Sequence, residues 1–273
     1  MRMKILLILT LVIGLKNYAQ DLSNNQKLWL SNYTFVKINS RFSIDNFVVV
    51  SYDLNANNRL GFAQTDLGLN YNLRKRLRLF IAYSNNQFRF LNSYYKRYDT
   101  DPNSLGMFTV HRLGMGAQHT WKINRNWRFT NKLVGQFYTP KLLKYQFRHM
   151  YVGTINYRHR KLPFKFRPFA QGFLYYYSGG FKYDYKDDET GEVESLSPNG
   201  LHRYRLRAGF SFKPIPKFKP LTLKAYYGFQ REFNFPFGND LNVERIGTYT
   251  GNTYTDLKFN DYSIWGLQFN LVF

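Results

Sequence analysis

The segment from Tyr262 to Phe273 constrains the fold of this chain more than any other part of the sequence. Large apolar residues occupy every second position in it, namely Trp265, Leu267, Phe269, Leu271 and Phe273. The positions between them are mostly polar or glycine. Because side chains of a strand alternate between its two faces, the segment has one apolar face and one mostly polar face. An amphipathic strand that ends on an aromatic residue is similar to the signal by which barrels of the bacterial outer membrane are recognised for insertion. The segment therefore predicts a transmembrane β-barrel.

The amino terminus agrees with export from the cytoplasm. Arg2 and Lys4 precede an apolar run over residues 5–15, and a short polar stretch follows. This pattern predicts a signal peptide over residues 1–19, with cleavage after Ala19, and a barrel domain over residues 20–273. The apolar run is too short to cross a bilayer comfortably as a helix, and no later stretch approaches the ~18 apolar residues that a spanning helix needs. We therefore expect the chain in the outer membrane of a Gram-negative cell.

The composition is compatible with that location. Mean hydropathy is −0.47 although 19% of the residues are aromatic, as expected when half of each strand is polar and faces a lumen. The chain has no cysteine, which excludes both a disulfide framework and lipid attachment through a cysteine. The expected partners are outer-membrane lipid and lipopolysaccharide, and the barrel-assembly machinery during insertion.

Alternation with a period of two recurs along the chain and predicts eleven strands, with turn signals between them. Their expected ranges are 28–38, 41–53, 61–73, 77–91, 107–122, 127–139, 145–158, 165–177, 201–213, 221–233 and 259–273. Short and long connections alternate, as they do between the periplasmic and external ends of outer-membrane barrels. Single-chain bacterial barrels have even strand numbers, so we expect about twelve strands, within a range of ten to fourteen. The segment from Gln20 to Lys27 is the candidate for a twelfth strand; the alternative is that it plugs the pore. The predicted fold is an all-β, antiparallel, up-and-down barrel.

Several motifs carry a family resemblance. They are Trp29, the strand that begins Arg41-Phe42-Ser43-Ile44, the stretch 65–73 with the basic turn after it, Leu79 to Tyr83, the pattern Arg203-Tyr204-Arg205-Leu206-Arg207, and Glu232-Phe233. Together they resemble an uncharacterised outer-membrane barrel family common in Bacteroidota, domain of unknown function twenty-four-ninety. The resemblance implies a fold and a location and no activity. The insert from Ser178 to Gly200 has no counterpart in it.

The net charge of +22 raises the question of a nucleic-acid partner. The basic residues are distributed over strands and short turns instead of being gathered in one tail or helix. We therefore expect no nucleic-acid partner, and we interpret the charge as a cationic lumen with basic turns.

By alternation, nine basic residues fall on the predicted lumen face: Arg112, Arg128, Lys132, Arg148, Arg158, Arg203, Arg205, Arg207 and Lys224. An Arg or Lys on the lipid face near the bilayer centre costs about 2–4 kcal/mol, so such residues should point inward. The clearest lumen acids are Asp66 and Glu232. Two hypotheses follow. The lumen is either a positive pore that attracts anions, or a narrow interior filled by cations that pair with these acids and with tyrosines.

An enzyme is the alternative, because small outer-membrane barrels include phospholipases and lipid A deacylases. Those lipid hydrolases need a His that activates a nearby Ser, usually in a His-x-Ser arrangement. None of the five histidines is followed by Ser two positions on: His111, His119, His149, His159 and His202. The pattern favours interfacial or strand-end roles for these rings, and we predict no catalytic residue and no cofactor.

Two further motifs have ordinary structural interpretations. The acidic stretch in the long insert could offer oxygen ligands to calcium, but its spacing does not follow the calcium-loop pattern, so we expect a solvated hairpin with its turn near Gly191 and no metal. Its acids are Asp184, Asp187, Asp188, Glu189, Glu192 and Glu194. Gly114 and Gly116 are expected to leave room in the lumen for large side chains of neighbouring strands.

The sequence therefore predicts a non-enzymatic, integral outer-membrane barrel. It would be a structural or accessory component of the envelope, with a possible protein partner on its long external loops, or a narrow, porin-like channel that prefers anions. An outer-membrane lipid hydrolase is the alternative.

Overall fold

In the computed structural model, most of the predicted barrel domain is described. The described residues are 26–54, 59–89, 107–140, 145–159, 162–180, 183–186, 193–196, 199–215, 217–232, 247–249, 252–254 and 262–273. The expected signal peptide and residues 20–25 lie outside them, as do the acidic residues at positions 187–192. Among the described residues, no helix is long and apolar enough to cross a membrane.

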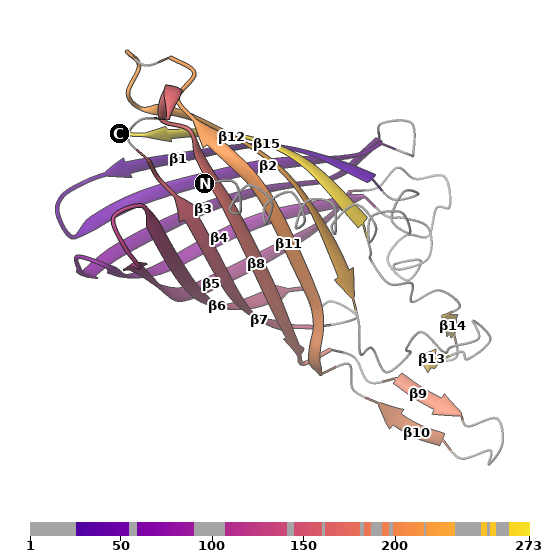
Figure 1. Cartoon of the computed structure of the whole chain (residues 1–273). Helices are drawn as coiled ribbons and strands as arrows, with labels where there is room; N and C mark the ends of the chain where they lie inside the picture. The colour runs from indigo at the N-terminus through magenta and orange to yellow at the C-terminus, as the bar shows by residue number, and fades with distance from the viewer. Residues whose placement is uncertain are drawn as a thin grey trace.

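Eleven strands close into one barrel (Figure 1). They are β1 (Gln26–Lys37), β2 (Phe42–Asp53), β3 (Arg59–Arg74), β4 (Leu77–Arg89), β5 (Met107–Lys122), β6 (Trp127–Thr139), β7 (Phe147–Tyr157), β8 (Arg167–Ser178), β11 (Gly200–Phe212), β12 (Leu221–Glu232) and β15 (Tyr262–Val272). Each corresponds to one of the eleven segments expected from alternation, with ends that differ by at most three residues. The predicted all-β barrel is confirmed.

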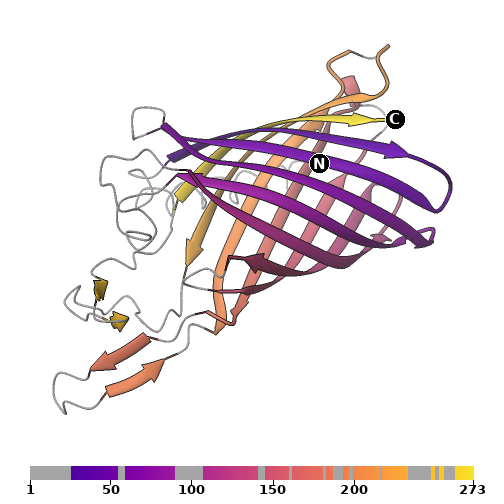
Figure 2. The same ribbon diagram turned by 180° about the vertical axis from the view of Figure 1, so that it is seen from behind.

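The two ends of the barrel differ. The strands at one end are joined by the turns 38–41, 75–76, 123–126, 158–166 and 213–220, the fourth of which holds the 3-10 turn η2 (Pro163–Lys165). We refer to this as the short-turn end, and Phe273 lies there (Figure 2). The opposite, long-loop end carries the connections 54–58, 90–106, 140–146, 179–199 and 233–261. The three connections that were expected to be long, 90–106, 179–199 and 233–261, all belong to this end, whereas 54–58 and 140–146 at the same end are shorter than the 158–166 turn at the other.

A second, small sheet lies beyond the long-loop end (Figures 1 and 2). It contains β9 (Tyr183–Lys186), β10 (Val193–Leu196), β13 (Gly247–Tyr249) and β14 (Asn252–Tyr254), in the order β10-β9-β13-β14. β9 and β10 pair antiparallel, so the expected hairpin in the acidic insert is present. Alternation had not predicted these short strands.

The barrel closes through a parallel pair. β1 runs alongside β15 in parallel register, from Gln26 opposite Ser263 to Phe35 opposite Val272. When neighbouring strands alternate in direction, an odd number leaves the first and the last pointing the same way. The count of eleven lies within the predicted range and is one below the favoured twelve, and the closing pair departs from the purely antiparallel arrangement expected. Among the described residues no twelfth strand separates β1 from β15. Gln26 and Lys27, which were expected to contribute to such a strand, are the first two residues of β1, and β1 pairs directly with β15.

Alternation places apolar side chains on the outer face. On β3, Leu67 and Leu69 are 56% and 44% exposed, while Asn70 is buried. On β15, Trp265, Phe269 and Phe273 are likewise exposed, and Leu267 and Leu271 share their face. A folded protein in water normally exposes isolated apolar residues, not a continuous apolar belt. The orientation predicted for the carboxy-terminal strand is therefore observed.

The interior is more aromatic than alternation alone predicted. One buried cluster contains Trp29, Val49, Phe169, Tyr226, Tyr262 and Ile264. A second contains Val110, Tyr138, Tyr145, Tyr175 and Tyr177. Gly116 makes room for a ring as expected, because an added Cβ would come within 2.6 Å of the Phe80 ring, whereas at Gly114 it would meet no atom closer than 3.6 Å. The barrel therefore has an apolar outer face and an interior in which aromatic and charged side chains are mixed.

Candidate functional site

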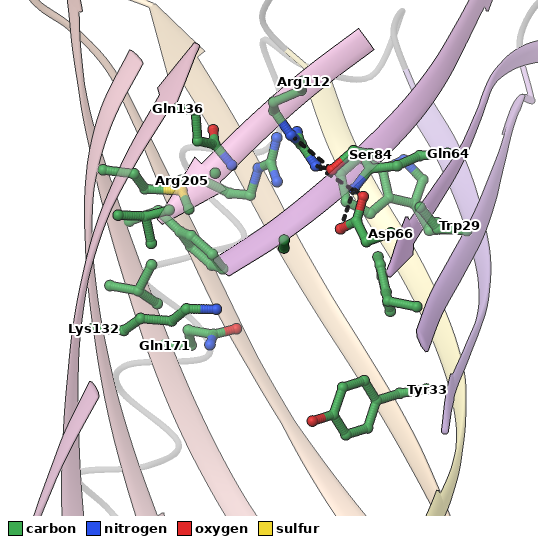
Figure 3. A pocket seen from close by; sticks show the side chains of 18 of the residues that line it. Trp29, Tyr33, Gln64, Asp66, Ser84, Arg112, Lys132, Gln136, Gln171 and Arg205 are labelled. Atoms are coloured by element: carbon green, nitrogen blue, oxygen red, sulfur yellow. Dashed lines mark hydrogen bonds and ion pairs between the residues drawn. The ribbon is translucent and has the colours of Figure 1, made fainter. Parts of the chain in front are cut away.

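The barrel encloses a cavity of about 940 Å³ whose lining includes residues from all eleven barrel strands. Figure 3 shows this space, with Trp29 and Asp66 on one side and Lys132, Gln171 and Arg205 reaching in from the other. Its volume is at the upper end of the range for small-molecule sites. The lumen is the candidate functional site.

Seven of the nine predicted lumen cations line this cavity: Arg112, Lys132, Arg148, Arg203, Arg205, Arg207 and Lys224. Arg128 and Arg158 lie at the short-turn end instead, beyond the cavity. Arg128 is the second residue of β6, opposite Lys122, and Arg158 follows the last residue of β7. Both occupy positions that alternate with inward-facing residues. Because β6 and β7 end at this level, the two side chains lie at the rim of the barrel and not along the cavity. Partial burial and repulsion by Arg167 and Arg128 lower the pKa of Arg158.

Three lumen cations form ion pairs with carboxylates. Lys27 Nζ lies 2.5 Å from Asp53 Oδ1, Arg112 Nη2 lies 3.0 Å from Asp66 Oδ1, and Arg203 pairs with Glu232. Both predicted lumen acids thus have arginine partners. The first pair, between direct partners in the β1–β2 register, was missed from sequence because the expected strand began at position 28 and left Lys27 out, whereas β1 begins at Gln26.

Arg112 is held by a local hydrogen-bond network (Figure 3). Its Nη2 donates to Asp66 Oδ1 at 3.0 Å and to Ser84 Oγ at 2.8 Å, and its Nε also donates to Ser84. Gln64 Nε2 donates to both Asp66 oxygens, at 2.9 and 2.8 Å. Charge-assisted bonds of this kind are short and directional, so this group is a rigid crosslink in which the charge is neutralised.

Six other cations line the cavity without an ion pair to any described residue: Arg78, Lys132, Arg148, Arg205, Arg207 and Lys224. Amides and aromatic rings take the place of carboxylates. Arg78 donates to Gln118 at 2.8 Å. Lys132 and Lys224 each lie 4.3 Å from a ring centroid, of Phe80 and Phe169 respectively. A cation over an aromatic face is attracted by the ring quadrupole, and the ring brings no opposite formal charge to cancel it.

Arg148 illustrates the arrangement in the second aromatic cluster. Its Nε donates to Gln136 Oε1 at 2.8 Å. Its guanidinium lies 5.1 Å from the Tyr138 ring and 5.4 Å from the Tyr175 ring. The charge is therefore solvated by protein groups and is not cancelled by an acid.

Arg205 and Arg207 occupy the first cluster. Both guanidiniums lie over Trp29 of β1, at 4.8 and 4.9 Å, and over Phe173 of β8, at 5.6 and 4.9 Å. Arg205 also donates to Gln230 at 2.5 Å and to the Tyr262 hydroxyl at 3.1 Å. Since β12 and β15 separate β11 from β1, these two side chains reach across part of the lumen.

The described lumen carries an excess of positive charge. Nine cations line the cavity, with Lys27 and Arg78 joining the seven predicted ones, against the three acids Asp45, Asp53 and Asp66. Glu232, paired with Arg203, is the fourth acid, which leaves five positive charges in excess. Asp45 accepts hydrogen bonds from Tyr33 and Asn70. It was missed from sequence because apolar residues occur on both faces of β2, as in the run of valines at 48–50, and obscure the alternation.

Four of the histidines lie on the outer face or near strand ends, whereas His202, the third residue of β11, is buried against the Tyr177 ring. His111 Nδ1 lies 2.7 Å from the hydroxyl of Tyr83 on the outer face, and His119 packs edge-on against Trp121. His159 follows β7 and stacks on Tyr157. Among the described residues, no group of three or more potential metal ligands comes together.

Comparison with protein-family models and with curated protein sequences found no match to this chain. The resemblance to the Bacteroidota barrel family therefore stays a prediction. The function has to be inferred from the lumen itself.

Proposed function

We propose that this chain is an outer-membrane barrel that forms a narrow passage with a preference for anions. The observation that carries the proposal is the set of six lumen cations that have no carboxylate partner among the described residues. Rings of Arg and Lys select anions in known pores, and a low-dielectric wall concentrates the field of such charges in the lumen.

The outer face supports a membrane setting for this passage. Large apolar side chains such as Leu67, Met115 and Leu133 are more than half exposed around the barrel wall. In water this surface would drive aggregation, whereas in a bilayer it matches the hydrocarbon. In this proposal the short turns face the periplasm, the long loops face outward, and the carboxy-terminal strand is the insertion signal.

The way in which the cations are held supports passage of anions over mere filling of the lumen. Three arginine or lysine pairs are neutralised and act as crosslinks. The remaining six are positioned by rings and amides, which orient a cation without removing its charge. An anion that enters would meet several such charges in succession, none of them strong enough alone to trap it, and conduction requires this balance.

Planar-bilayer recording tests the proposal. With a tenfold KCl gradient, we expect a small conductance whose reversal potential has the sign of chloride permeation. The combined variant Lys132→Gln and Lys224→Gln should move the reversal potential toward zero. The matched control, Lys75→Gln with Lys122→Gln, removes two exposed lysines near the short-turn end and should move it much less.

Other results would contradict the proposal. Cation preference, or equal shifts in the two double variants, would show that the lumen charges do not select the ion. A folded barrel that stays silent in bilayers would favour the structural or accessory role in an envelope assembly. Turnover of phospholipid or lipid A by the purified barrel would instead favour the hydrolase.

A further inference from the structure

Arg205 and Arg207 form a compact group with aromatic side chains from three other strands. We call it the arginine-aromatic site, and its members are Trp29, Phe173, Arg205, Arg207 and Tyr226. The Arg207 guanidinium lies 4.9 Å from Trp29, 4.9 Å from Phe173 and 4.8 Å from Tyr226. Every member lines the cavity, so a molecule in the lumen can reach the site.

The hydrogen-bonding state of Arg207 distinguishes it from the other arginine. Arg205 donates to Gln230 and Tyr262. Arg207 Nε, in contrast, is buried and has no hydrogen-bond acceptor among the described residues. A buried donor without an acceptor is costly, and native proteins seldom leave one unsatisfied unless a ligand or water completes it. Stacking on rings leaves the in-plane N–H groups of a guanidinium available for the two oxygens of an oxyanion.

The surroundings of the two arginines are apolar. Phe47 and Phe62 pack against the cluster that contains Trp29, and both line the cavity. The Phe62 ring meets the Trp29 ring edge to face, at 5.3 Å between centroids. A small inorganic anion would satisfy the guanidinium and would leave this apolar surface in contact with water. A ligand that covers both parts needs an oxyanion joined to an apolar ring.

We infer that the lumen binds aromatic carboxylates or sulfonates at the arginine-aromatic site. The oxyanion accepts hydrogen bonds from Arg207 and interacts with the charge of Arg205, and the ring of the ligand packs against the aromatic wall at Phe47 and Phe62. This inference deepens the proposed passage, because it names the class of solute that the passage would take. The arginines act as binding residues, and Trp29 and Phe173 position them.

Equilibrium binding to the folded barrel in non-ionic detergent tests the inference. The probe is 2-naphthoate, titrated calorimetrically against protein and against protein-free micelles, with acetate as the comparison. We expect 2-naphthoate to bind at least tenfold more tightly than acetate. Arg207→Gln should weaken naphthoate binding at least tenfold. Arg128→Gln removes the same charge on an inward position beyond the cavity, and it should change the affinity less than threefold.

Two further variants separate the ring stacking from the charge. Arg207→Lys keeps the charge and loses the planar fork, so it should bind naphthoate several-fold more weakly than the parent chain. Phe62→Leu should weaken naphthoate and leave acetate unchanged. Each variant is first checked for the heat-modifiable electrophoretic mobility of a closed barrel, so that a loss of binding is read only from folded protein.

The outcomes are distinguishable from those of the bilayer experiment. Naphthoate binding by a barrel that is silent in bilayers would support the site and reject the passage. An anion conductance without a tenfold tighter binding of 2-naphthoate than of acetate would support the passage and reject the binding site. Equal losses of naphthoate affinity in Arg207→Gln and Arg128→Gln would also overturn the inference, because they would show that binding depends on the net charge of the protein and not on the arginine-aromatic site.

Discussion

Arg203 and Glu232 form a buried ion pair between the neighbouring strands β11 and β12, with Arg203 Nε donating to Glu232 Oε1 at 2.8 Å. The two residues are only 8% and 5% exposed. Rings of Tyr175 and Tyr177 lie 5.7 and 5.4 Å from the guanidinium. Both charges are largely shielded from water, so each is stabilised by the other.

Glu232→Gln should therefore destabilise the barrel strongly. Breaking a buried pair costs about 3–5 kcal/mol because the remaining charge stays uncompensated. Urea unfolding of the vesicle-inserted protein measures the difference in free energy of unfolding. The double variant Arg203→Met with Glu232→Met should lose less than Glu232→Gln alone, since it leaves no orphan charge. A single variant as stable as the parent would contradict the prediction.

Gly266 of β15 lies directly against the ring of Tyr226 on β12, and a Cβ added at position 266 would overlap that ring. Gly266→Ala should displace Tyr226 and lower the free energy of unfolding by about 1–3 kcal/mol, the usual cost of overpacking. Tyr226→Ala added to Gly266→Ala should remove the clash, and the two effects should then be strongly non-additive in unfolding experiments.

Gly135→Ala is the matched control for that substitution. Its added Cβ would find its nearest neighbour, His149 Nδ1, at 3.8 Å, which is an ordinary contact. We expect an unfolding free energy close to that of the parent chain. Equal losses at positions 266 and 135 would assign the effect to strand glycines in general and not to the Tyr226 ring.

The parallel closure of the barrel can be tested by crosslinking. Asn32 and Phe269 are direct partners across the β1–β15 seam, and neighbouring strands lie within the Cα separation that a disulfide allows. The chain has no cysteine, so Asn32→Cys with Phe269→Cys should give one disulfide, seen as a loss of two mass units and a shift in mobility.

A register control accompanies the seam experiment. Asn32→Cys with Gln268→Cys places the two thiols on opposite faces of the wall, and it should not crosslink. If a twelfth strand lay between β1 and β15, it would hold positions 32 and 269 apart, and the cysteines at Asn32 and Phe269 would not crosslink either. Failure of Asn32 and Phe269 cysteines to join in the folded barrel would therefore reject the eleven-stranded closure.

Lys213 follows β11 at the short-turn end, where partial burial and the charges of Lys165, Arg167 and Lys219 lower its pKa. The folded state then releases this proton at a lower pH than the unfolded chain does. Relative to the unfolded state, the barrel gains stability as the pH rises from the lowered pKa to the ordinary lysine value of about 10.4. Titration of ¹³C-methylated lysines by NMR should place Lys213 below that value.

Arg167→Gln provides the test of the cause. Removing one neighbouring cation should raise the pKa of Lys213 toward the ordinary value, and added salt should do the same by screening. A Lys213 pKa that stays unchanged in Arg167→Gln would exclude Arg167 as a cause and would leave burial with the charges of Lys165 and Lys219. A pKa at or above about 10.4 in the parent chain would contradict the prediction altogether.

Much of the barrel was predictable because its signals are local. Thr65 to Leu73 alternates so regularly that the exposure of Leu67 and Leu69 follows from the pattern alone. Turn residues near each strand end set the boundaries to within a few residues. The number of strands was harder to predict, since an even count was assumed from the rule for single-chain bacterial barrels, while the alternating segments themselves numbered eleven.

The inner face was predictable only in part. Arg112 and Arg203 were assigned to the lumen because a cation is costly on a lipid-facing wall. No such penalty marks an aromatic residue, which suits either face. Trp29 therefore gave no sequence signal for the inside, although Arg207 lies over its ring. Tyr226 alternates with Lys224 on one face, so its inward position follows from the pattern, but its contact with Arg207 does not.

Alternation along the chain by itself determined the eleven barrel strands, their apolar outer face and most of the cationic residues of the lumen, because each depends on neighbours within about ten residues. Only the tertiary structure decided which cations meet a carboxylate and which meet a ring. Arg203 forms an ion pair with Glu232 on the next strand, whereas Arg207 lies over the ring of Trp29, near the opposite end of the chain. Such pairings depend on the register of many strands and on the parallel seam that closes them, and neither is encoded in any single segment.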